Sequence, residues 1–132
     1  MTTPNIGGNN MPVLIVYGMS AETSGYGKLI NNLQSATANV LGDIHPDDVS
    51  VFFPDDIVEV NLGDELICII DGLFRKPERT TILRRRLASA IVSVLRRFAS
   101  EHIPQCGKIE AIISRFNQDT DGFAVWEREK KS

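Results

Sequence analysis

Apolar and polar positions follow the same order twice along this chain. A continuous apolar run at residues 13–17 (VLIVY) precedes a stretch in which apolar side chains recur every three or four positions, and a second run follows at 49–53 (VSVFF). The order returns at 66–70 (LICII), across 83–98 and at 109–114. Short continuous apolar runs are typical of buried strands, and spacings of three and four are typical of one helix face. The pattern predicts two strand-helix-strand units.

Both predicted helices carry signals at their ends. Gly42 follows the last apolar position of the first helix, as a terminating glycine does, and the second helix ends before Pro104. Pro77 and Glu78 suit the first turn of the second helix, because proline has a fixed φ and a carboxylate is favoured at the positive end of the helix dipole. The predicted apolar stripes are Leu29, Ile30, Leu33, Ala36, Thr37, Val40 and Leu41, and then Leu83, Leu87, Ala90, Ile91, Val94, Leu95 and Phe98.

Three further segments have weaker patterns. Residues 57–60 (IVEV) alternate and predict a minor strand, and residues 122–126 (GFAVW) predict a terminal strand or hairpin arm. Residues 1–11 offer almost nothing apolar to bury. We therefore expect this segment to be a flexible leader, the product of an upstream start or a remnant of expression.

The two units together define one domain over residues 12–132, with pseudo-repeats at 12–62 and 63–126. Each unit holds its two strands parallel, because crossover connections are right-handed. Side by side, the units give an α/β (α+β) fold, a four-stranded mixed sheet with both helices on one face. The other sheet face is too apolar to remain in water, so we expect other subunits to cover it.

Composition excludes some partners. The chain has 132 residues, 42% of them hydrophobic, and a formal net charge of -3, so nothing draws it generally to nucleic acid or to an anionic membrane. The arginines at 84–86 and 96–97 are explained by the outer face of an amphipathic helix. The sequence contains neither a run of about 18 apolar residues nor a signal-peptide pattern. We predict a cytoplasmic protein without membrane or nucleic-acid partners.

The two cysteines give no sign of a metal centre. Cys68 lies in an apolar strand pattern and Cys106 in a loop, without a CxxC pair or a histidine at ligand spacing. A reducing compartment disfavours a disulfide between them. We predict two free thiols, no metal and no cofactor.

One family combines these features in the same order. Met11-Pro12 stands directly before the first strand, two strand-helix-strand units fill residues 12–126, and the segment 67–91 (ICIIDGLFRKPERTTILRRRLASAI) places Arg75 in the turn before the second helix. In this the chain resembles the tautomerase superfamily. Arg75 stands at the position of an arginine that binds a substrate carboxylate in that family.

The resemblance implies a homotrimer that acts as a keto-enol tautomerase or double-bond isomerase on a small carboxylated substrate. Pro12 would be the general base if Met11 were the true start and were removed. An α-amino group titrates at a pH of about 7.7–8.0, and an apolar pocket with nearby cations lowers its pKa toward neutrality, where a base is most effective. The further candidates for substrate binding are Ser50, His45 as a proton shuttle and Trp126 as an aromatic wall. A surface imidazole and a packing residue are the simpler interpretations of His45 and Trp126.

The sequence also departs from the family pattern. Ser50 stands where the family often has a second arginine. The turn after the first strand carries Met19-Ser20 and no arginine. Because Met11 precedes Pro12, the nitrogen of Pro12 in this chain is an amide without a basic lone pair. An alternative therefore stays open, a catalytically inactive tautomerase-fold oligomer that serves as a small-molecule or protein-binding module.

Overall fold

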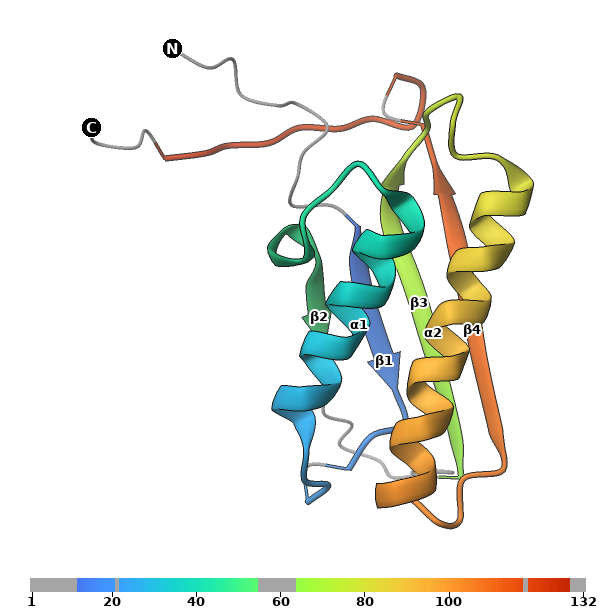
Figure 1. Cartoon of the computed structure of the whole chain (residues 1–132). Helices are drawn as coiled ribbons and strands as arrows, with labels where there is room; N and C mark the ends of the chain where they lie inside the picture. The colour runs from blue at the N-terminus through green and yellow to red at the C-terminus, as the bar shows by residue number, and fades with distance from the viewer. Residues whose placement is uncertain (1–11, 21, 55–63, 118, 129–132) are drawn as a thin grey trace.

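Two helices lie side by side on one face of a four-stranded sheet (Figure 1). The structure, a computed structural model, describes residues 12–20, 22–54, 64–117 and 119–128. The predicted leader at 1–11 and the predicted minor strand at 57–60 lie outside the described residues. In chain order the elements are β1 (Val13–Tyr17), α1 (Tyr26–Leu41), a short 3-10 turn (Pro46–Asp48), β2 (Ser50–Phe52), β3 (Glu65–Phe74), α2 (Thr81–His102) and β4 (Lys108–Phe116).

The sheet has the predicted mixed topology, with the order β2-β1-β3-β4. Within each unit the strands run parallel, β1 with β2 and β3 with β4. The units meet through an antiparallel pair in which Val13 of β1 lies opposite Asp71 of β3. The predicted fold class, two strand-helix-strand units with both helices on one face, is confirmed.

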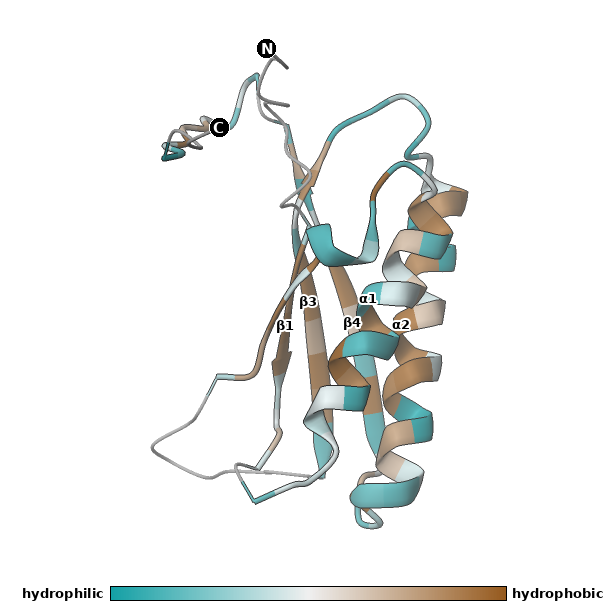
Figure 2. Cartoon of the chain, turned by 60° about the vertical axis from the view of Figure 1, so that its left-hand side comes forward, coloured by the Kyte–Doolittle hydropathy of each residue, from teal (hydrophilic) through white to brown (hydrophobic). Residues whose placement is uncertain are grey.

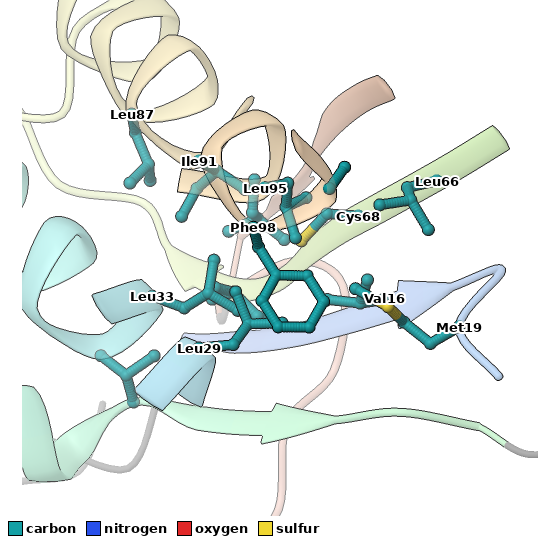
Figure 3. Packing of buried hydrophobic residues seen from close by; sticks show 14 of the residues in the cluster. Val16, Met19, Leu29, Leu33, Leu66, Cys68, Leu87, Ile91, Leu95 and Phe98 are labelled. Atoms are coloured by element: carbon teal, nitrogen blue, oxygen red, sulfur yellow. The ribbon is translucent and has the colours of Figure 1, made fainter. Parts of the chain in front are cut away.

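The core lies between the sheet and the helices (Figure 3). Alternate residues of β1 and β3 point to the helices and are fully buried, and leucine and isoleucine side chains from both helices meet them. Each such side chain contributes about 1.5–3 kcal/mol on leaving water. The fully buried set includes Leu14, Val16, Leu66, Cys68, Ile70, Leu33, Leu87, Ile91 and Leu95.

No helix among the described residues covers the second sheet face (Figure 2). One row of apolar side chains crosses all four strands in register on that face: Phe52, Ile15, Ile69 and Ile112. Phe52 is 57% exposed and Ile112 is 47% exposed. The apolar face that the sequence predicts is therefore present in the single chain.

Two element boundaries of the second unit differ by several residues from the prediction. Strand β3 continues to Phe74, past the predicted end at Ile70, because Gly72 adopts a left-handed φ of 68° at an irregularity in the pairing with β4. Helix α2 begins only at Thr81. Pro77 and Glu78 instead occupy a turn closed by the N–H of Arg79 donating to the carbonyl of Lys76, and proline is favoured in such a turn.

The predicted C-terminal strand is wrong. Residues 122–128 are irregular and extend away from the sheet (Figure 1), and Gly122 has a left-handed φ of 85°. Phe123 is nevertheless fixed against the end of the sheet, since its ring lies 5.0 Å from that of Phe74. Within the described residues, no helix is long and apolar enough to cross a membrane.

Candidate functional site

One end of the sheet collects the chemistry-bearing residues. Because β1 and β3 are antiparallel, the start of β1 lies beside the end of β3, and the parallel partners place the start of β2 and the end of β4 there too. Pro12 is buried at this end, and its carbonyl accepts a hydrogen bond from the N–H of Ser50 at 3.3 Å. Arg75 directly follows β3, and Arg115 lies at the end of β4.

A cavity of about 500 Å³ opens at the same end, between the ends of β3 and β4 and the start of α2. Its charged lining is mostly cationic, and Asp121 is the one carboxylate that the described part of the chain contributes to it. The cations are Arg75, Lys76, Arg79, Arg84 and Arg115, and the apolar lining comprises Leu73, Phe74, Pro77, Ile113 and Phe116. Volumes of 300–1,000 Å³ are typical of small-molecule sites.

Arg79 is the buried anchor of this cavity, since only 6% of its surface is exposed. Its Nη1 donates to the carbonyl of Phe74 at 2.7 Å and its Nη2 lies 3.5 Å from Asp43, whose carboxylate also accepts from Lys76 at 3.0 Å. Burial of Asp43 acts to raise its pKa, but the hydrogen bond from Lys76 and the charge of Arg79 outweigh it and hold the pKa below its usual value. These contacts tie the loop after α1 to the loop before α2.

Arg84 and Arg115 also line the cavity, and neither has a charged partner among the described residues. Arg84 donates to the carbonyl of Arg79 at 2.6 Å and to the hydroxyl of Thr81 at 3.1 Å. Arg115 is exposed at the end of β4, and among the described residues no carboxylate forms an ion pair with either guanidinium. The cavity therefore keeps a surplus of positive charge, which suits a carboxylate or a phosphate.

The structure brings together only some of the residues proposed from the sequence. Arg75 lines the cavity. Pro12 and Ser50 lie at the same end of the sheet but not in the cavity lining, and Ser50 is the register partner of Val13, the residue after Pro12.

The remaining two candidates lie outside the cavity. The Nδ1 of His45 accepts the N–H of Asp47 at 3.1 Å, so this imidazole caps the 3-10 turn. Trp126 is 78% exposed, and the guanidinium carbon of Arg128 lies 6.0 Å from the centroid of its ring.

Neither cysteine offers an alternative nucleophile within the cavity. Burial raises the pKa of the Cys68 thiol to about 12, so this thiol stays protonated and unreactive near neutral pH. Cys106 lies at the opposite end of β4 from the cavity. In the part of the chain that the structure describes, no three His, Cys, Asp or Glu side chains are grouped as metal ligands.

Arg79, Arg84 and Arg115 are the site residues that the sequence analysis did not single out. Arg84 was assigned to the outer helix face with its two arginine neighbours, although it lies in the first turn of α2. The position of these residues in the chain could have identified them. Parallel strands end at the same edge of a sheet, and the first turn of the helix that follows a strand begins there too, so residues at these places lie close together.

The arrangement of helices and strands is the fold of the tautomerase superfamily. The chain is similar to a fused 4-OT in an asymmetric trimer, with a TM-score of 0.62 and 15% identity over 85% of this chain and 92% of that one. It is similar to Pt0534 inactivated by 2-oxo-3-pentynoate, with a TM-score of 0.62 and 17% identity over 86% and 93%. A 5-carboxymethyl-2-hydroxymuconate delta-isomerase gives 0.59 and 14% over 96% and 93%. No protein-family model matches the sequence, and no curated protein matches it significantly.

Proposed function

We propose that this protein is a keto-enol tautomerase or double-bond isomerase for a small carboxylated substrate, active when Pro12 is its amino terminus. The observation that carries the proposal is the position of Pro12, buried at the start of β1 at the sheet end where the cationic cavity opens. The tautomerase fold over nearly the whole chain supports it.

In the proposed reaction Pro12 moves the proton. Its secondary amine is neutral near pH 7, because burial and nearby guanidinium groups disfavour the ammonium form. The amine takes a proton from the carbon beside a carbonyl or from an enol hydroxyl and returns it to another atom of the same substrate. No metal or cofactor is part of the proposal.

Arg75 is the proposed anchor for the substrate carboxylate, through the planar fork of its guanidinium. Pro12 does not line the cavity of its own chain, so we infer that Arg75 comes from a neighbouring subunit of a homotrimer. The apolar row on the open sheet face is the surface on which the subunits would meet. Ser50, His45 and Trp126 stay predicted as further substrate contacts, with Ser50 the nearest of them to Pro12 in the sheet.

The second candidate function is a non-catalytic binding module with the same fold. Two observations favour it. Met11 acylates Pro12 in the present sequence, and Ser50 replaces the cation that would share the charge developing on the substrate. A binding module would keep the cationic cavity and lose the proton transfer.

The decisive experiment starts translation at Met11 and verifies by intact mass that Pro12 is the amino terminus. Ketonisation of phenylenolpyruvate and of 2-hydroxymuconate is then followed by absorbance. We expect turnover that is lost in Pro12→Ala and in the chain that retains residues 1–11. A verified amino-terminal Pro12 without turnover on either substrate overturns the enzyme proposal and leaves the binding module.

A chemical label separates a reactive amine from a merely exposed one. Because 2-oxo-3-pentynoate inactivates Pt0534 and carries a triple bond conjugated to a ketone, a neutral secondary amine can add to it. We expect peptide mapping to find one adduct per chain, on Pro12, and none on Pro12→Ala. Labelling of Pro12→Ala to the same extent would contradict a nucleophilic Pro12.

A further inference from the structure

The described lining of the cationic cavity lies within one strand-helix-strand unit. Among the residues that the structure describes, those that line it fall between Leu73 and Asp121, and Pro12 is not one of them. The ligand chemistry of the cavity can be derived separately from the proposed proton transfer, although the two share Arg75.

Charge compensation inside the cavity is incomplete. Asp43 serves both Lys76 and Arg79. Asp121, the one carboxylate of the described lining, accepts the N–H of Asn117 at 2.8 Å and the hydroxyl of Thr120 at 3.4 Å, so it closes a turn. The charges of Arg84 and Arg115 remain without an ion-pair partner among the described residues.

The start of α2 adds to the positive field. Thr80 caps the helix by accepting the N–H of Leu83, and both Thr80 and Thr81 line the cavity. The first turn of a 22-residue helix favours an anion, because its backbone N–H groups have no partner within the helix. The guanidinium of Arg79 is buried beside this turn, and its Nε has no hydrogen-bond partner among the residues that the structure describes. The start of α2 and the guanidinium of Arg79 therefore both favour an anionic ligand.

Apolar side chains form the remaining wall. Leu73 and Phe74 are buried at the end of β3, and Ile113 and Phe116 of β4 are half-buried beside them. A bare inorganic ion would leave the exposed parts of Ile113 and Phe116 against water. A ligand with an apolar body covers these two side chains and gains the free energy of their burial.

We propose that this cavity binds a small organic dianion, in which an apolar body packs on Phe116 and Ile113 and the negative groups contact Arg84 and Arg115. A phosphate monoester and a dicarboxylate share this chemistry. Guanidinium groups bind either one through paired hydrogen bonds. Arg84 and Arg115 are thereby binding residues in addition to Arg75.

The test uses the full chain with residues 1–11 in place, which cannot carry out the Pro12 chemistry. Calorimetry measures binding of phenyl phosphate, phthalate, benzoate and inorganic phosphate. We expect at least one of the two aromatic dianions to bind about tenfold more tightly than benzoate, which lacks one charge, and than inorganic phosphate, which lacks the apolar body. The better of phenyl phosphate and phthalate identifies the anionic group.

Matched variants locate the site. Arg115→Gln removes an exposed guanidinium with no partner to lose, and we expect it to weaken binding of the better dianion by about tenfold. Arg85→Gln removes the same charge from an exposed position of α2 outside the cavity lining, and we expect less than about a twofold change. Arg84→Lys keeps the charge but loses the fork, so it should also weaken binding while circular dichroism stays unchanged.

Two results would overturn the proposal. One is the absence of binding by both dianions at millimolar concentration. The other is an equal loss of dianion affinity in Arg85→Gln and Arg115→Gln, which would mean that the overall positive charge attracts the dianion and that the cavity does not bind it specifically. Failure of the tautomerase proposal is distinguishable, because it is measured as turnover by the Met11-start chain, whereas dianion binding is measured by calorimetry on the full chain.

Discussion

At the scale of single residues, the position of Arg79 depends on one carboxylate. A buried guanidinium is costly unless its N–H groups and its charge are matched. Phe74 supplies a carbonyl and Asp43 supplies the charge, while the Nε has no partner among the described residues. Arg79 can therefore keep its place beside the cavity only while Asp43 is ionised.

Asp43→Asn tests this dependence. The change keeps the size of the side chain and removes its charge, and we expect it to lower the free energy of unfolding at pH 7 by about 1–2 kcal/mol, since Asp43 is partly exposed. Urea denaturation measures the loss. Asp47→Asn removes a carboxylate from an exposed pair with His45 and is the matched control, with almost no expected change.

The pH dependence of the free energy of unfolding tests the same role of the Asp43 charge. The pKa of Asp43 is lower in the folded chain than its ordinary value of 3.8, so its contribution is present above pH 3.8 and is lost as the pH falls through the folded-state pKa. The stability difference between the wild type and Asp43→Asn should shrink over that range. A difference that stays constant down to the acid limit of folding would contradict the role given to the charge.

At the scale of elements, β3 reaches the cavity only because its pairing changes at Gly72. The register with β4 shifts between Ile70 and Leu73, and the strand then continues to Phe74, whose ring packs 5.5 Å from that of Phe116. Gly72 has a φ of 68°, which glycine adopts without steric cost and alanine does not. This one residue places the end of β3, and hence Arg75, at the cavity.

Gly72→Ala should lower the free energy of unfolding by about 1–2 kcal/mol, because alanine is strained at this φ. Gly107→Ala is the control, since a methyl group there meets nothing within 4 Å and its φ lies outside the left-handed region. Chemical denaturation of both variants measures the difference. Equal stabilities would show that the end of β3 does not require the left-handed conformation.

The elements were predictable where one local pattern decided them. Continuous apolar runs and spacings of three to four, with Gly42 at a helix end, predicted four strands, two helices and the topology. The end of β3 was missed because glycine is ambiguous between a turn and an irregular strand. The start of α2 was missed because Pro77 suits a turn and a first helical turn equally well.

The site was less predictable, since its residues are far apart in the sequence. Arg75 was found through a family resemblance, whereas Arg79, Arg84 and Arg115 meet it only after β3, α2 and β4 have packed. Their common location follows from topology and not from spacing. Burial of Arg79 in particular depends on Asp43, which lies in the other unit.

At the scale of the whole molecule, the open sheet face links assembly to function. Its apolar row of Phe52, Ile15, Ile69 and Ile112 resembles one side of a subunit interface, and the fused 4-OT with the same fold is a trimer. Three copies packed by this face would bury the row, and the proposed reaction requires that they also place the Arg75 of one chain near the Pro12 of another. Assembly is then a condition of the proposed reaction but not of anion binding.

Ile112→Glu tests that link, because a carboxylate without a partner is costly to bury between subunits. We expect sedimentation velocity to show a monomer for Ile112→Glu and an oligomer for the wild type. Ile82→Glu is the matched control, since Ile82 is 73% exposed on α2, away from the sheet, and should leave the oligomer intact. The Ile112→Glu monomer should still bind the organic dianion, whose cavity lies within one chain, yet its Met11-start form should lack tautomerase activity. Full activity in that monomer would mean that Pro12 and its carboxylate anchor belong to the same chain.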